Sequence, residues 1–484
     1  MKILFAASEV APFAKTGGLA DVAGSLPRAL AALGHDVSVV LPRYRQVDVE
    51  RYGLRHAASF YVPLASWKER CDILVGSLGP KVTAYFVNKD IYYDRPELYR
   101  TLRGDHPDNA ERFIFFSRAI PELCRALDIA PDIVHCNDWQ TGLVPVYLRT
   151  LYRGVPQFTR TRSVFTIHNL GYQGLFWHWD LPMTGLGWDV FTPGGIEFWG
   201  NMNLLKAGIV FADAVTTVSA TYAKEIQTPE YGHGLDGVLR GRAADLTGIV
   251  NGIDYDEWDP AADRSIAKSY SAARPAGKQA CRKALLDELG LPATAAPVIG
   301  MVTRLSDQKG LDILVDALPE IMALGARLVV LGTGDERYHR LLRDAGRLHA
   351  AQMHVLLAYD DALARRIYAG ADMFLMPSRY EPCGLGQMHA LRYGTVPVVR
   401  RTGGLADTVA DHDAKTGTGT GFLFDEYTAD ALAACVRRAV SVFSDPPAWK
   451  RLMRAGMRVD LSWQRSAKDY VKVYRKILKE RTKD

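Results

Sequence analysis

The chain has 484 residues, of which 48% are hydrophobic and 23% charged, and its formal net charge is +5. This length exceeds what one ordinary hydrophobic core supports, so we expect two domains in a globular protein rather than a disordered or fibrous one. No run rich in lysine and arginine resembles a nucleic-acid arm, and no apolar run approaches the roughly 18 residues that a membrane span needs.

The six cysteines are scattered, without a C-x-x-C pair or the spacing of metal ligands. This pattern favours a reducing compartment over a disulfide framework. Strand and loop signals begin at the second residue, so we expect no signal peptide. The sequence therefore predicts a cytoplasmic protein with neither nucleic acid nor membrane as a partner.

A glycine-rich loop follows the first predicted strand. Residues 2–7 predict a short buried strand, and apolar residues between positions 19 and 33 recur at helical spacing. Between them lies KTGGLAD, residues 15–21, where backbone N–H groups and the helix dipole favour an anion. The letters TGGLAD return at 402–407, after an apolar run at 395–399. Two phosphate-type loops predict two Rossmann-like domains that face each other.

Strand and helix signals alternate through the first half of the chain. Such alternation predicts a doubly wound parallel sheet, with ligands bound at the carboxyl ends of its strands. Polar residues follow the predicted strands there, including Asp138, His168 and Asn169. A lone histidine is as easily a structural residue as a catalyst, so His168 is left open between these roles. The expected strands are 36–41, 81–87, 132–136, 163–167, 214–218 and 247–250, with a helix at 111–127.

The alternation stops at about residue 255 and resumes near 297. We therefore expect a first domain at 1–254, a boundary region at 255–296, a second domain at 297–460 and a C-terminal helical segment at 461–484. The second block has predicted strands at 298–303, 327–331, 353–357, 373–376 and 395–399, and helices at 311–324, 361–369, 429–442 and 466–478.

Two cations lie in the loop after the first strand of the second block. Arg304 supplies paired donors and Lys309 a point charge, so together they suit a diphosphate. The alternative is a pair of solvated surface cations. Their position at a strand end favours the functional interpretation.

The segment EPCGLG, residues 381–386, follows another predicted strand. Gly384 and Gly386 open a predicted helix at 387–393, where amides can meet a phosphate or a sugar oxygen. Glu381 can accept hydrogen bonds from sugar hydroxyls. The alternative is a helix-capping turn with a surface glutamate, and Cys136 and Cys383 are most simply unreactive thiols.

Three short patterns carry little weight. Residues 254–256 match the D-x-D pattern of metal-dependent glycosyltransferases, but nothing nearby completes an oxygen site for a metal. Residues 332–334 give half of G-x-G-x-x-G without its third glycine, and no nucleotide P-loop is present. We therefore expect neither a metal nor NAD.

Together the motifs resemble one family, the bacterial glycogen synthases and plant starch synthases. The matching segments follow the order of that family over nearly the whole chain. They are KTGGLAD at 15, HCNDWQTGL at 135, TIHNLGYQGLF at 166, NGID at 251, VTRLSDQKG at 302, PSRYEPCGLGQ at 377, RTGGLADTV at 401 and GTGFLF at 419.

The resemblance implies the GT-B architecture, in which two Rossmann-like domains face a cleft that holds the active site. It also implies retaining transfer of glucose from ADP-glucose to the non-reducing 4-OH of an α-1,4-glucan such as glycogen, without a metal. No lysine is identified for pyridoxal phosphate, so no cofactor is expected. The final helix is expected to cross back onto the first domain, as in family members.

The resemblance also implies roles for individual residues. Catalytic roles fall to Lys15, His168, Arg304, Lys309 and Glu381. Asp138 and Asn169 lie on the acceptor side, and Tyr359 is the candidate to stack on adenine. The donor-binding set is Lys15, Gly17, Gly18, Asp21, Arg304, Lys309, Tyr359, Glu381, Cys383, Gly384, Leu385 and Gly386.

Several alternatives remain open. Gly386 departs from the pattern of the family, because some relatives carry a hydroxyl or amide side chain at this position. The donor could be UDP-glucose, since Tyr359 would stack on either base. In a different class, the chain could be a glucan-binding scaffold without catalysis, although the intact Lys15, Arg304, Lys309 and Glu381 argue against it. Whether the chain forms a homo-oligomer is left open.

Overall fold

The computed structural model describes residues 1–101 and 104–480. Contacts divide the chain into two compact units. Unit 1 contains Met1–Val218, Ala223–Gly252 and the chain from Trp463 onward, and unit 2 contains Ser219–Tyr222 and Ile253–Ser462. The last four residues of the helical segment expected at 461–484 lie outside the described residues.

Unit 1 is built on a nine-stranded sheet with the order β14-β13-β9-β8-β1-β2-β5-β4-β3. The pairings from β14 to β5 are parallel, and β4 and β3 continue the sheet in the antiparallel sense. The strands are β1 (Lys2–Ala6), β2 (Asp36–Pro42), β3 (Arg55–Leu64), β4 (Trp67–Gly79), β5 (Val82–Asn88), β8 (Ile133–Asn137), β9 (Arg162–Ile167), β13 (Ala214–Thr217) and β14 (Leu246–Gly248).

The central strands of unit 1 are buried on both faces because helices cover the sheet. β1 is buried at every residue after Lys2, and β8 at every residue, which explains their nearly continuous apolar sequences. The long β3–β4 hairpin was not among the expected strands. Its exposed and partly buried residues are mixed along both strands, so its sequence lacks the apolar run that marks a buried strand.

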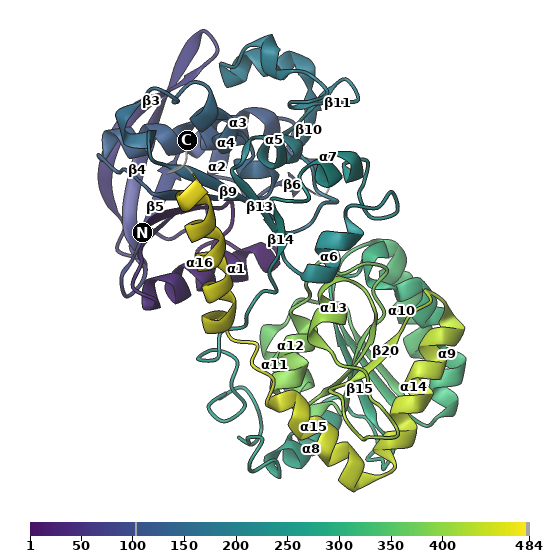
Figure 1. Ribbon diagram of the computed structural model, residues 1–484. Coiled ribbons are helices and arrows are strands. Elements are labelled where there is room, and N and C mark those ends of the chain that lie inside the picture. Colours follow the sequence, from purple (N-terminus) through teal and green to yellow (C-terminus); the bar gives the residue numbers. More distant parts are fainter. Residues whose placement is uncertain (102–103, 481–484) are drawn as a thin grey trace. The chain divides into compact units, whose positions relative to one another are not determined.

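The C-terminal helix α16 belongs to unit 1, where it packs against α1 and β9 (Figure 1). Its Tyr474 hydroxyl lies 2.7 Å from Nδ1 of His135, a buried residue of β8. Helices with residues in unit 1 are α1 (Gly18–Ala32), α2 (Asp90–Tyr93), α3 (Asn109–Ala126), α4 (Leu143–Arg149), α5 (Leu204–Phe211), α6 (Ala220–Glu225), α7 (Asp236–Gly241) and α16 (Trp463–Glu480).

Two smaller sheets complete unit 1. One is a three-stranded antiparallel sheet with the order β10-β12-β11, inserted between β9 and α5 in the chain. Its strands are β10 (Leu175–Trp177), β11 (Glu197–Phe198) and β12 (Asn201–Asn203). The other sheet has two strands, β6 (Arg100–Thr101) and β7 (Gly104–Asp105).

Unit 2 has a six-stranded sheet with the order β17-β16-β15-β18-β19-β20, parallel throughout. Its strands are β15 (Val298–Val302), β16 (Arg327–Leu331), β17 (Met353–Leu356), β18 (Met373–Met376), β19 (Val396–Arg400) and β20 (Phe422–Phe424). Its helices are α8 (Gly277–Glu288), α9 (Leu311–Ala323), α10 (Glu336–Leu348), α11 (Asp361–Gly370), α12 (Gly386–Arg392), α13 (Gly403–Thr408), α14 (Ala429–Phe443) and α15 (Pro446–Met457).

The segment 255–296, expected as a boundary region, is part of unit 2 and contains α8. This helix packs against α11 through the buried residues Cys281, Leu285 and Leu286. The predicted fold class of two doubly wound α/β units is confirmed. Among the described helices, none is both long and apolar enough to cross a membrane.

Candidate active site

Each parallel sheet has one point where the strand order reverses. In unit 1 the chain goes from β1 to β2 on one side and returns to β8 on the other, and in unit 2 β15 lies between β16 and β18. Loops at the carboxyl ends diverge at such a point and leave a crevice for a ligand. The predicted site residues follow these strands or their neighbours.

In unit 1, the loop after β1 is organised by a buried carboxylate, Glu9. Its oxygens accept hydrogen bonds from the backbone N–H of Thr16 at 2.5 Å, the Thr16 hydroxyl at 2.7 Å and the N–H of Gly17 at 3.1 Å. The Tyr99 hydroxyl adds a fourth bond at 2.8 Å. Glu9 is 4% exposed, so these four donors replace the water it loses.

This arrangement limits the anion site that the sequence predicts at KTGGLAD. Two of the loop amides already donate to Glu9, so an anion has to reach the amides of α1 itself, from Gly18 onward. The Lys15 side chain is 43% exposed, so a ligand can reach it. Its ammonium lies 2.7 Å from the carboxylate of Asp21. Lys15 and Asp21 thus form a surface pair beside the start of α1.

Asp138 follows β8 with a positive φ of 55° and a ψ of −179°. Its Oδ1 accepts the backbone N–H of His168 at 2.8 Å, and its carboxyl also accepts the N–H of Asn169. Burial raises the pKa of Asp138 from 3.8 to about 7, the two N–H donors oppose this rise, and the negative charge of Glu9 adds to it. The structure therefore brings Asp138, His168 and Asn169 together around one carboxyl group.

His168 is held by the neighbouring residue Asn137. The Asn137 amide nitrogen donates to the carbonyls of Ala6 at 2.9 Å and His135 at 3.3 Å, which turns its oxygen toward His168 Nε2 at 2.9 Å. An amide oxygen only accepts, so Nε2 carries the proton. Burial lowers the pKa of His168 to about 3, so the ring is neutral at pH 7 and Nδ1 is a hydrogen-bond acceptor.

In unit 2, the loops after β15 and β18 are joined by an ion pair. Lys309 Nζ donates to Glu381 Oε2 at 2.6 Å, and the Ser378 hydroxyl donates to the same oxygen at 2.9 Å. The side chains of Lys309 and Glu381 are 16% and 6% exposed. Gly310 permits this approach, because a Cβ there would overlap with the carbonyl of Pro377.

In the second TGGLAD segment, where a phosphate loop was expected, an amide is used within the protein. The N–H of Gly404 donates to the carbonyls of Glu381 at 3.0 Å and Pro382 at 3.2 Å. Side chains at Gly403 and Gly404 would overlap with the backbone of Glu381 and Cys383. These glycines therefore let α13 support the loop that carries Glu381.

The remaining residues of this loop enter α12. Gly384 has φ of 71°, and a Cβ there would overlap with the Gln387 side chain, whose amide nitrogen donates to the Cys383 carbonyl at 2.9 Å. Leu385 precedes the helix and Gly386 begins it. Gly386 is packed on Phe374, so a Cβ would come within 3.0 Å of that ring.

Two of the residues predicted on the donor side, Arg304 and Tyr359, are exposed. The Arg304 side chain is exposed in the loop after β15. Tyr359 is 77% exposed beyond the end of β17, and β17 is separated from β15 by β16, so the two strands lie about 10 Å apart. Tyr359 is thus accessible for stacking, at a distance from the Lys309–Glu381 pair.

The sequence interpretation missed Glu9 and Ser378, and it placed Asn137 among the polar residues at the strand ends without foreseeing its contact with His168. Each lies within three residues of the end of a central strand, so position alone could have marked them. Their roles depend on partners such as Thr16, which no local pattern identifies. Within the described part of the chain, no group of three or more His, Cys, Asp or Glu side chains is arranged to hold a metal ion.

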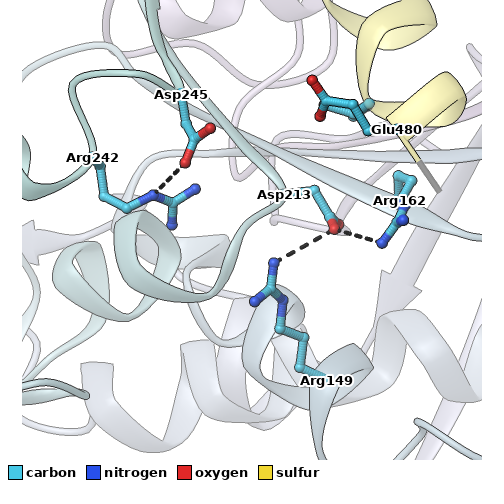
Figure 2. Close-up of a pocket in the computed structure, with 7 residues that line it drawn as sticks. Arg149, Arg162, Asp213, Arg242, Asp245 and Glu480 are labelled. Carbon is cyan, nitrogen blue, oxygen red and sulfur yellow. Dashed lines mark hydrogen bonds and ion pairs between the residues drawn. The ribbon is translucent and has the colours of Figure 1, made fainter. Parts of the chain in front are cut away.

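A hollow of about 420 Å³ lies at the opposite edge of the unit 1 sheet, near the amino ends of β9, β13 and β14. Its charged lining consists of Arg149, Arg162, Arg242, Asp213, Asp245 and Glu480. Figure 2 shows two arginines directed at Asp213, at 3.5 and 3.0 Å, and Arg242 directed at Asp245, at 2.9 Å. The three arginines are paired with Asp213 and Asp245, and Glu480 adds a third carboxylate to the lining, which marks a structural ion network rather than an anion site.

Known proteins resemble this chain along its full length. Residues 2–241 match the family model described as starch synthase catalytic domain, and residues 289–451 match glycosyl transferases group 1. The glycogen synthase of Koribacter versatilis is 52% identical over 476 residues, covering 98% of each chain. The glycogen synthase of Anaeromyxobacter dehalogenans is 50% identical over 480 residues, covering 98% of this chain and 99% of the relative.

Solved structures give the same result. The catalytic domain of starch synthase IV from Arabidopsis thaliana, bound to ADP and acarbose, superposes with a TM-score of 0.91 at 33% identity over 99% of both chains. Sucrose-phosphate synthase from Thermosynechococcus elongatus superposes with a TM-score of 0.62 at 18% identity over 99% of both, which is a likeness of fold alone. The chain therefore belongs to the family of bacterial glycogen synthases and plant starch synthases, and it is a glycosyltransferase with the GT-B fold.

Proposed function

We propose that the enzyme transfers glucose from ADP-glucose to the non-reducing 4-OH of an α-1,4-glucan such as glycogen, with retention and without a metal. The observation that carries the proposal is the Lys309–Glu381 ion pair, at 2.6 Å, between the loops after β15 and β18. A cation at the point where the strand order reverses suits a diphosphate, and a carboxylate beside it suits sugar hydroxyls. The resemblance to a starch synthase solved with ADP and acarbose supports both assignments.

In this proposal, unit 2 binds the nucleotide sugar. Lys309 and Arg304 hold the diphosphate, Glu381 and the segment 383–386 hold the glucose and its phosphate, and the exposed Tyr359 ring stacks on adenine. When the bond between C1 and the phosphate oxygen breaks, its electron pair stays on the phosphate. Fixed cations stabilise that negative charge in the transition state, where such groups have their largest effect on rate.

Unit 1 binds the acceptor glucan and contributes Lys15 to the donor. Neutral His168 offers Nδ1 to a glucose hydroxyl, while Asp138 and Asn169 lie on the acceptor side. The acceptor 4-OH attacks C1 from the face that the phosphate leaves, and the departing phosphate oxygen takes the 4-OH proton. This route keeps the configuration at C1 without a carboxylate nucleophile, in contrast with retaining hydrolases. Trapping a glucosyl ester on any aspartate or glutamate of the chain would contradict it.

The test measures initial rates of labelled glucose transfer onto glycogen, from ADP-glucose and UDP-glucose in parallel, with and without EDTA. We expect a strong preference for ADP-glucose and no effect of the chelator. Preference for UDP-glucose would reassign the donor, and loss of activity with EDTA would reject the metal-free mechanism. Glycogen binding without transfer from either donor would favour the scaffold.

A further inference from the structure

Four exposed tryptophans are concentrated in one segment of unit 1, between β9 and α5. They are Trp177, Trp179, Trp188 and Trp199, with exposures of 61%, 58%, 48% and 83%. Among the described residues, only one other tryptophan, Trp67, is classed as exposed. We call the four side chains the tryptophan patch. Exposed aromatic surface of this kind marks an interaction site.

Three members of the patch have neighbouring rings, and the backbone of the fourth, Trp199, lies at the same end of the small sheet. The ring centre of Trp179 lies 6.4 Å from that of Trp177 and 5.7 Å from that of Trp188. Trp177 pairs with Asn201 in the three-stranded sheet, and Trp199 forms the turn that precedes this asparagine. The sheet therefore places the Trp199 turn beside the Trp177 end of β10.

Trp199 is held in a conformation that suits other residues better. Its φ is 53° and that of Gly200 is 79°, so both lie in the left-handed region where tight hairpin turns favour asparagine and glycine. For a bulky residue this conformation is strained. An indole that is 83% exposed recovers little of that cost by packing within the chain. A ligand that contacts the ring would account for tryptophan at this position.

The turn is also rigidly supported. Buried Lys206 of α5 donates to the carbonyls of Pro193 at 2.6 Å and Glu197 at 2.5 Å. The Glu197 carboxylate accepts the N–H of Gly200 at 2.7 Å, across the turn that holds Trp199. The indole is thus presented on a fixed scaffold, which lowers the entropy cost of binding.

The patch continues directly from the residues on the acceptor side. Asn169 Oδ1 accepts the N–H of Gly171 at 3.0 Å, and the chain then enters β10. Phe176, on the opposite face of β10 from Trp177, packs on Trp139 at 5.6 Å between ring centres. Trp139 follows Asp138, so the acceptor residues and the patch share one packed segment.

We propose that the tryptophan patch binds an α-glucan chain several units away from the end that receives glucose. This rests on the proposed function, because a polymeric acceptor extends beyond its reacting end and needs a surface there. The apolar C–H faces of glucose can stack on indole rings, and sugar hydroxyls can donate to Asp180 and Asp189, which flank the indoles in the chain. A membrane surface fits less well, because basic side chains attract anionic headgroups and the acidic ones here do not.

The decisive variant is Trp199→Asn, because asparagine suits the left-handed turn and the fold should be kept. We expect its dissociation constant for glycogen to rise about threefold to tenfold, because the variant loses roughly one aromatic stacking contact with the glucan. The ratio of its rate on glycogen to its rate on maltotriose, at limiting acceptor, should fall by a similar factor. Its melting temperature should equal or exceed that of the parent chain. Trp67→Asn is the matched control, an exposed tryptophan of the same unit outside the patch.

Glycogen affinity that is unchanged in both Trp199→Asn and the Trp177→Ala/Trp179→Ala double variant would overturn the proposal. Sedimentation velocity offers a second way to overturn the proposal. If the variants lose self-association while their glycogen affinity stays the same, the patch binds a second copy of the chain instead of a glucan. If the parent chain transfers no glucose but Trp199→Asn still weakens glycogen binding, the patch stands and the proposed reaction fails.

Discussion

Replacing Asp138 by asparagine should stabilise the protein in a pH-dependent way. The buried carboxyl has a pKa of about 7 in the folded chain, against 3.8 ordinarily. Between these values the folded state holds a proton that the unfolded state has lost, so the wild-type chain loses stability as the pH rises toward 7. Asparagine keeps an oxygen to accept the N–H of His168 but never ionises, so it avoids this loss.

The magnitude follows from the two pKa values. Above the folded pKa, ionising Asp138 costs about 4 kcal/mol, because the two pKa values differ by about 3 and each unit corresponds to about 1.4 kcal/mol. Part of this cost is already present at about pH 5, since the unfolded carboxyl has largely ionised there. The advantage of Asp138→Asn over wild type should therefore grow by about 2 to 3 kcal/mol between about pH 5 and about pH 8.

The assay is urea unfolding of both chains at the two pH values, followed by fluorescence and circular dichroism. Asp128→Asn is the matched control, because Asp128 is an exposed aspartate of unit 1 with a similar φ of 51°. It separates the effect of asparagine at a positive φ from the removal of a buried charge. An advantage of Asp138→Asn that is the same at both pH values, or that matches the control, would refute the reasoning.

Three further variants test the remaining contacts. Lys309→Ala should lower kcat by on the order of 100-fold while glycogen binding persists, and loss of glycogen affinity at unchanged kcat would contradict the diphosphate role. Tyr474→Phe removes the hydroxyl 2.7 Å from buried His135 and should cost about 1 to 3 kcal/mol in urea unfolding, whereas exposed Tyr61→Phe should have little effect. Gly403→Ala should lower the melting temperature and kcat, because its Cβ would overlap with the Glu381 carbonyl. Gly417→Ala, with φ of 70° and nothing within 4 Å of the added Cβ, should cause the smaller loss, so equal melting temperatures would count against the overlap.

All the parallel strands except β20, which has only three residues, could be predicted because their sequences are nearly continuous apolar runs between helices. Strand β16 at Arg327–Leu331 and strand β18 at Met373–Met376 match the expected limits. Helix α8 was missed because only four of its residues, Lys278 among them, are buried, so its sequence is mostly polar. The β3–β4 hairpin was missed for a similar reason, since neither strand has a continuous buried run.

Candidate site residues could be located from the sequence wherever position at a strand end was the criterion. Asp138, His168, Lys309 and Glu381 were found in this way, and the structure pairs them as two local groups, one in each unit. The pairing itself could not be predicted. Lys309 and Glu381 are 72 residues apart in the chain, and they meet because β15 and β18 are neighbours in the sheet.

The repeated TGGLAD segments show why identical letters need not have the same function. In unit 1 the loop is held by Glu9, which takes the amides of Thr16 and Gly17. In unit 2 the glycine pair permits close packing against the backbone of Glu381 and Cys383. Several amides that the motif would offer to a phosphate are therefore used within the protein. In the proposed reaction, the charge on the leaving diphosphate then falls largely to side-chain cations. Substitution of Lys309 should therefore lower the rate more than any change in the glycine loops that leaves the fold intact.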